Sequence, residues 1–101
     1  MTTDAPSPLE PTWFVDGIYG PDAAEARAPF RTAHLARLRD LIASGSVVTA
    51  GSFPDMSGSV MIIRAASEQE ALDLFREDPY LLNGVWVELR ARPFLTVRDR
   101  L

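Results

Sequence analysis

The feature that most restricts the fold is the order in which strand-like and helix-like segments follow one another. Segments rich in β-branched and aromatic residues occupy residues 13–19, 47–53, 60–65 and 85–97. A helical pattern covers about residues 22–43, and a second one begins at Ser67 and ends before Pro79. The order β-α-β-β-α-β predicts an α+β, ferredoxin-like βαββαβ fold, in which a four-stranded antiparallel sheet carries two helices on one face.

Local signals define the two helices. Pro29 interrupts the first and predicts a short turn or a kink before the main helix, which Gly45 ends. Ser67 and Glu70 form a capping box that opens the second helix. Apolar residues at three- and four-residue spacing predict the buried faces, namely Phe30, Ala33, Leu35, Leu38, Leu41 and Ile42 in the first helix and Ala71, Leu74 and Phe75 in the second.

The proline content sets the expected domain limits. Three prolines among small polar residues predict a flexible N-terminal segment over residues 1–11, and residues 12–101 form the single domain. Gly17 indicates a bulge or a close backbone approach in the first strand. Pro93 predicts a break or bend in the last strand.

The central strands are apolar on both sides. Val60 and Ile62 alternate with Met61 and Ile63, so the helices can cover only one of the two sets. An apolar face without a cover is typical of an interaction surface. We therefore expect a homodimer that packs sheet to sheet.

Composition narrows the function. The net charge of −4 disfavours nucleic acid as a partner, since phosphates require a basic surface. The chain has no cysteine and no lysine, which excludes thiol and Schiff-base chemistry and leaves arginine to bind anions. No membrane-length apolar run and no signal-peptide pattern occur, so we expect a soluble, cytoplasmic protein that does not bind membranes.

His34 is the only histidine, and it falls within the apolar stripe of the first helix. Histidine is the side chain whose unperturbed pKa suits proton transfer near neutral pH. A half-buried structural histidine would give the same pattern. A single histidine without cysteine neighbours is a poor metal site, and no cofactor-binding motif is present, so neither a metal nor a cofactor is expected.

Asp78 is the second candidate. At the end of the second predicted helix, beside Glu77, a carboxylate opposes the helix dipole, and a broken local rule can mark a functional position. The alternative is that Asp78 and Pro79 only form a helix-ending turn.

Four further residues are candidates for binding a small molecule. Arg31 lies one helical turn before His34 and could clamp a carboxylate or orient Asp78, or could be a solvated surface residue. Gly51 and Ser52 could present backbone amides and a hydroxyl to a ligand, or only make room for packing. Tyr80 could line a pocket rim or belong to the core.

These segments resemble the YciI-like (YCII domain) family. The helix motif R-x-x-H-L occurs at 31–35, and residues 48–52 resemble the second-strand signature, with Ser52 in place of the usual proline. Residues 78–80, 84–85 and 92–94 are similar to the pattern of the helix end and last strand. The resemblance extends over about residues 13–97, and the loop between the second and third strands is short for the family.

The resemblance implies a fold that dimerises into a dimeric α/β barrel, as in muconolactone isomerase-type proteins, and an active site made by a His–Asp pair, here His34 and Asp78. The leading hypothesis is a small cofactor-independent lyase, isomerase or hydrolase that transfers a proton on a small organic molecule. Two alternatives remain: a non-catalytic dimeric ligand-binding or accessory protein, and a purely structural dimerisation domain, which would have no pocket around His34.

Overall fold

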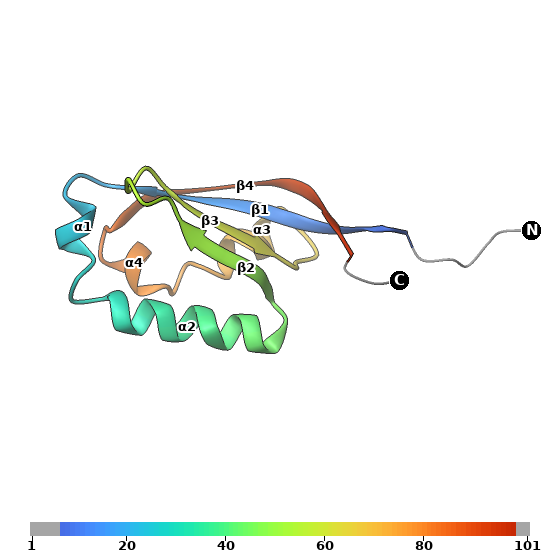
Figure 1. Ribbon diagram of the computed structural model, residues 1–101, viewed down its shortest axis with the longest axis horizontal. Helices are drawn as coiled ribbons and strands as arrows, with labels where there is room; N and C mark the ends of the chain where they lie inside the picture. Colours follow the sequence, from blue (N-terminus) through green and yellow to red (C-terminus); the bar gives the residue numbers. More distant parts are fainter. Residues whose placement is uncertain (1–6, 99–101) are drawn as a thin grey trace, which may run out of the picture.

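The computed structural model describes residues 7–98 and confirms the predicted order of strands with intervening helices. The elements are β1 (Leu9–Tyr19), α1 (Ala23–Ala26), α2 (Arg31–Ser44), β2 (Val47–Ser52), β3 (Ser59–Ile63), α3 (Glu68–Asp73), α4 (Pro79–Leu82) and β4 (Trp86–Val97). The strands form one antiparallel sheet in the order β2-β3-β1-β4. The helices lie on one side of this sheet (Figure 1), as the ferredoxin-like class requires. No helix of the described chain is long and apolar enough to cross a membrane.

The structure corrects two predictions that rested on prolines: the sheet begins before residue 11, and the last strand is not broken at Pro93. β1 begins at Leu9, so residues 9–11 belong to the sheet rather than to a flexible segment, and residues 1–6 lie outside the described residues. Pro11 is tolerated because that part of β1 pairs only with β4. Pro93 does not break β4, which pairs with β1 on both sides of it as an edge strand. The register shift lies instead between Ile18 and Tyr19.

The first helical region divides at Pro29 as predicted, into α1 and α2. Gly45 ends α2 with a φ of 88°, a left-handed conformation that glycine adopts without steric cost. The buried face of α2 is narrower than predicted, because Ala33 and Ile42 are exposed. α2 packs mainly on β2 at the edge of the sheet, so only a narrow row of its side chains is covered.

The second helical region is two short helices rather than one. Ser67 caps α3, where its Oγ accepts a hydrogen bond from the backbone N–H of Glu70 at 3.1 Å. Ala71 and Phe75 are buried as predicted, and Leu74 is partly buried. The chain then turns, and α4 starts at Pro79.

The core lies between the sheet and the helices. Trp86 is its largest fully buried side chain. The ring of Trp86 occupies the space above Gly17, where an added Cβ would come within 2.7 Å of it. Gly17 therefore marks the close approach that its position in a strand indicated. Val60 and Ile62 lie on the other side of the sheet, since they alternate with Met61 and Ile63, which pack in the core.

We expect Gly17→Ala to lower the free energy of unfolding by about 1–3 kcal/mol, because the new methyl group would overlap the fixed Trp86 ring. Urea unfolding followed by tryptophan fluorescence measures this change. Gly51→Ala is the matched control, since an added Cβ there meets nothing within 4 Å. Equal stability of the two variants would contradict the packing argument.

Candidate active site

His34 and Asp78, 44 residues apart in sequence, are in direct contact. His34 projects from α2 toward the sheet, and its Nδ1 lies 2.8 Å from Asp78 Oδ1. The two residues are buried, with 4% of His34 and none of Asp78 exposed. This distance is that of a strong, charge-assisted hydrogen bond.

The contact fixes the state of the imidazole ring. A carboxylate can only accept hydrogen bonds, so Nδ1 of His34 carries a proton, and this N–H group donates a hydrogen bond to Asp78. In the neutral ring, Nε2 then holds the free lone pair. Nε2 has no hydrogen-bond partner among the described residues. Every fully buried side-chain nitrogen in these residues has a partner, so Nε2 is not fully buried and is accessible to a small molecule.

Asp78 is the N-cap of α4, so the sequence-based view of it as a helix C-terminus was wrong. Its Oδ1 accepts a hydrogen bond at 2.9 Å from the backbone N–H of Tyr80. Pro79 occupies the first position of the helix, where no N–H donor is needed. The carboxylate is thus locally favourable, and the cap directs it toward His34.

Arg37, rather than Arg31, orients Asp78. Arg37 Nη1 lies 3.4 Å from Asp78 Oδ2, and Nη2 donates to the carbonyl oxygen of Leu74. Arg37 follows His34 by one helical turn on α2, so both side chains reach the same carboxylate. The guanidinium balances the buried negative charge.

Aromatic rings hold the imidazole from two directions. Tyr80 stacks on His34 with ring centroids 3.7 Å apart and an interplanar angle of 9°. Trp86 meets His34 edge to face, with centroids 5.1 Å apart. These contacts leave the histidine one orientation, with Nδ1 at Asp78.

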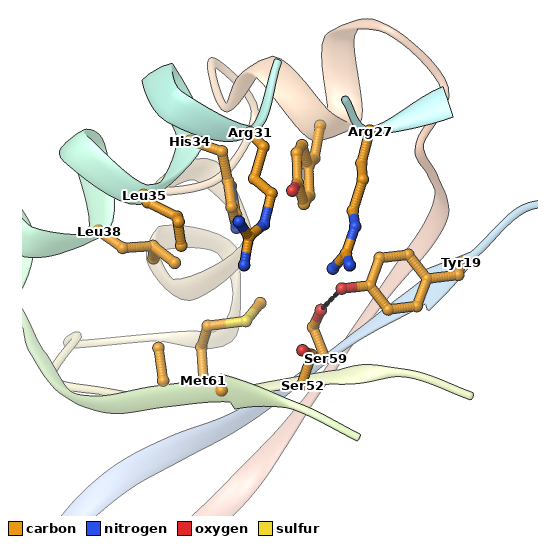
Figure 2. A pocket seen from close by; sticks show the side chains of 12 residues that line it. Tyr19, Arg27, Arg31, His34, Leu35, Leu38, Ser52, Ser59 and Met61 are labelled. Carbon is orange, nitrogen blue, oxygen red and sulfur yellow. Dashed lines mark hydrogen bonds between the residues drawn. The ribbon is translucent and has the colours of Figure 1, made fainter. Parts of the chain in front are cut away.

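A pocket of about 100 Å³ opens beside His34. Figure 2 shows side chains from α2 on one wall and from the β2–β3 side of the sheet opposite. Its lining residues are Tyr19, Arg27, Arg31, His34, Leu35, Leu38, Ala50, Gly51, Ser52, Ser59, Met61 and Tyr80. All four predicted ligand-binding residues are among them, while Asp78 lies behind His34. A pocket at this position contradicts the purely structural hypothesis.

Three polar pocket residues were missed from the sequence. Arg27 follows α1, Tyr19 ends β1 and Ser59 begins β3, so only the folded chain brings them together. Ser59 donates a hydrogen bond to the hydroxyl of Tyr19 at 2.8 Å (Figure 2). The position of each at the end of an element was the one available signal, because binding residues often occur there.

The pocket is electropositive. Arg27 and Arg31 extend into it (Figure 2), and neither has a carboxylate within salt-bridge distance in residues 7–98. No lining residue is acidic. Burial raises the pKa of the Tyr80 hydroxyl above its usual value and outweighs the effect of Arg27 and Arg31, whose charges lower this pKa. The hydroxyl therefore stays protonated at neutral pH.

The fold and the site together define a class: a small ferredoxin-like domain with a buried His–Asp pair beside an electropositive pocket. The YCII-related domain matches residues 14–95 of the chain. The chain belongs to this family, as its motifs indicated.

Three relatives match this chain over 83 to 87 residues. An uncharacterised protein of Haemophilus influenzae is 33% identical over 87 residues, which cover 76% of this chain and 89% of the relative. Protein YciI of Escherichia coli is 34% identical, covering 75% and 88%. The "derivative of benzaldehyde biosynthesis cluster protein C" of Emericella nidulans is 35% identical, covering 71% and 85%.

A solved structure has the same fold. The 5-chloro-2-hydroxyhydroquinone dehydrochlorinase TftG of Burkholderia phenoliruptrix, in complex with 2,5-dihydroxybenzoquinone, superposes with a TM-score of 0.70. The match covers 82% of this chain and 92% of TftG at 23% identity.

We expect Asp78→Asn to lower the free energy of unfolding by about 1.5–3 kcal/mol, because it removes the charge from buried hydrogen bonds with His34 and Arg37. Chemical denaturation measures the loss. Glu77→Gln removes the neighbouring, exposed carboxylate and is the control, for which we expect no more than about 0.5 kcal/mol. A similar effect of the two substitutions would show that Asp78 contributes no more than surface charge.

Proposed function

We propose that this protein is a cofactor-independent enzyme that transfers a proton on a small organic molecule, with His34 as the acid–base group. The observation that carries the proposal is the 2.8 Å contact between His34 Nδ1 and a buried carboxylate, which leaves Nε2 facing a pocket. A His–Asp pair with a free imidazole nitrogen at a cavity is a typical general acid–base arrangement.

The chemistry follows from the ring's protonation state. Nε2 of His34 takes a proton from a C–H or O–H group of the substrate, and the electron pair of that bond stays on the substrate. The imidazolium that forms keeps its Nδ1–H bond to Asp78, whose charge stabilises it. Return of the proton to another atom completes an isomerisation, and its transfer to a leaving group completes an elimination. In a hydrolysis, Nε2 takes a proton from water, the hydroxide oxygen bonds to the substrate, and the imidazolium gives the proton to the leaving group as its bond breaks.

The substrate is a small molecule that carries an anionic group. Arg31, one turn from His34, lines the pocket without a carboxylate within 4.0 Å in the described chain, and its charge would attract that group. Gly51, Ser52 and Tyr80 complete the walls. The names of two similar proteins, one a dehydrochlorinase solved with a quinone and the other from a benzaldehyde-derivative cluster, favour small aromatic or quinonoid compounds as the first candidates.

The working form would be a cytoplasmic homodimer joined through the uncovered face of the sheet. The described helices lie on one side of the sheet (Figure 1), and Val60 and Ile62 lie on the other, since they alternate with the core residues Met61 and Ile63. Phe14 and Phe94 lie on the same side, with ring centroids 6.0 Å apart. Apolar side chains on an open sheet favour association with a second copy.

Replacement of His34, the proposed acid–base group, tests the enzyme proposal. A panel of small aromatic acids, phenols and quinones, beginning with 2,5-dihydroxybenzoquinone, is screened for stabilisation by thermal shift and for conversion by chromatography. For a compound that is converted, His34→Gln should reduce turnover about 10²–10⁴-fold while the protein stays folded, because the proton acceptor is gone.

Arg39→Gln is the control for this experiment, since Arg39 is an exposed residue of α2 that does not line the pocket. Unchanged turnover in the His34→Gln protein would refute the acid–base role. Compounds that bind wild type without being converted would favour the non-catalytic ligand-binding alternative.

A charge on the open face tests the dimer. We expect Phe94→Arg to halve the mass measured by sedimentation equilibrium, because it places a cation among apolar side chains of the proposed interface, opposite Thr12 and beside Phe14. Ile42→Arg introduces the same charge on the exposed side of α2 and should leave the mass unchanged. A monomeric wild-type protein would contradict the proposal directly.

A further inference from the structure

The end of the pocket formed by Tyr19, Arg27 and Ser59 has no part in the His34–Asp78 pair, yet it concentrates hydrogen-bond donors. Figure 2 shows the ring of Tyr19 directed inward with its hydroxyl at Ser59, and Arg27 entering from the α1 side. These three residues come from different elements, and all of them line the pocket. Their arrangement therefore indicates a binding function.

The hydrogen bonds in this group have a defined direction. The indole N–H of Trp86 can only donate, and it does so to Ser59 Oγ at 3.2 Å. Ser59, only 4% exposed, has one proton, and the one further partner of its hydroxyl among the described residues is Tyr19 Oη, at 2.8 Å. Ser59 therefore donates to Tyr19. The proton of Tyr19 is then left to point into the pocket.

Arg27 adds a positive charge to the same end. Its guanidinium lines the pocket, and no carboxylate of the described chain lies within 4.0 Å of it. A fixed hydroxyl donor beside an unpaired guanidinium matches the needs of an oxygen that carries negative charge. A neutral ligand would leave this charge unpaired in a confined site.

We propose that Tyr19 and Arg27 form an oxyanion site, and that the ligand is a compact organic oxyanion such as a carboxylate, phenolate or enolate. The charged oxygen receives hydrogen bonds from the Tyr19 hydroxyl and the Arg27 guanidinium. The rest of the ligand extends toward His34. The inference rests on the proposed function only in assigning the ligand as a substrate, since the binding itself requires no proton transfer.

Binding of benzoate and benzamide, measured by isothermal titration calorimetry, tests the site. The two probes have nearly the same shape and differ in charge. We expect wild type to bind benzoate at least tenfold more tightly than benzamide. Arg27→Gln and Tyr19→Phe should each weaken benzoate binding by about tenfold, the effect of one lost charge-assisted hydrogen bond, and should leave benzamide binding unchanged.

Arg39→Gln is the matched control, because it removes the same charge from an exposed position away from the pocket. Circular dichroism confirms that each variant is folded, and two independent variants guard against a local disturbance in either. Equal affinity for the two probes, no benzoate binding at millimolar concentration, or full binding by Arg27→Gln would overturn the site. His34→Gln should still bind benzoate, so failure of the catalytic proposal is seen separately.

Discussion

The carboxylate of Asp78 is the interaction on which the site depends. It is fully buried and receives hydrogen bonds from three sources: His34 on α2, the backbone N–H of Tyr80 on α4, and Arg37. An isolated buried charge would be too costly to keep, so these donors are a requirement of the fold as well as of the site. One side chain thus joins α2 to α4 and sets the proton position on the imidazole.

Side-chain caps and buried contacts of this kind hold two very short helices in place. α3 and α4 are too short to be stable alone, since helix nucleation is unfavourable and each has few internal hydrogen bonds. α3 is fixed by the Ser67 cap and by burial of Ala71. α4 is fixed by its Asp78 cap and by Tyr80, which stacks on His34. The binding elements of the pocket are therefore parts of the core.

Much of the fold could be predicted from the sequence, because strand composition, helix spacing and caps are local properties. The Ser67 cap, the Pro29 break and the Gly45 helix end are all present. The full length of the pairing between β1 and β4 was not predicted, since Pro11 and Pro93 argue against continuous strands unless the neighbouring strand is known. Edge position is a property of the whole sheet and not of the sequence around a proline.

The candidate site, too, could be predicted only in part from the sequence. His34 and Asp78 stood out as unusual residues and lie in contact, although the reason given for Asp78 was wrong: it caps a helix rather than ending one. Arg37 was not among the predicted site residues, because it lies mostly outside the apolar stripe of the helix, yet it reaches the buried carboxylate. Arg27, Tyr19 and Ser59 carry no sequence pattern, since their shared role arises only where β1, α1 and β3 meet.

Trp86 connects these parts physically. Its ring fills the space above Gly17, its edge-to-face contact holds His34, and its indole N–H donates to Ser59. A shift of this ring would move the imidazole at one end of the pocket and the Ser59–Tyr19 hydrogen bond at the other. Because protein cores are close-packed, such a shift cannot be absorbed locally. The absence of a side chain at Gly17 is therefore required for the geometry of both ends of the pocket. The packing of Trp86 on the sheet thus determines where the proposed acid–base group and the proposed oxyanion site lie.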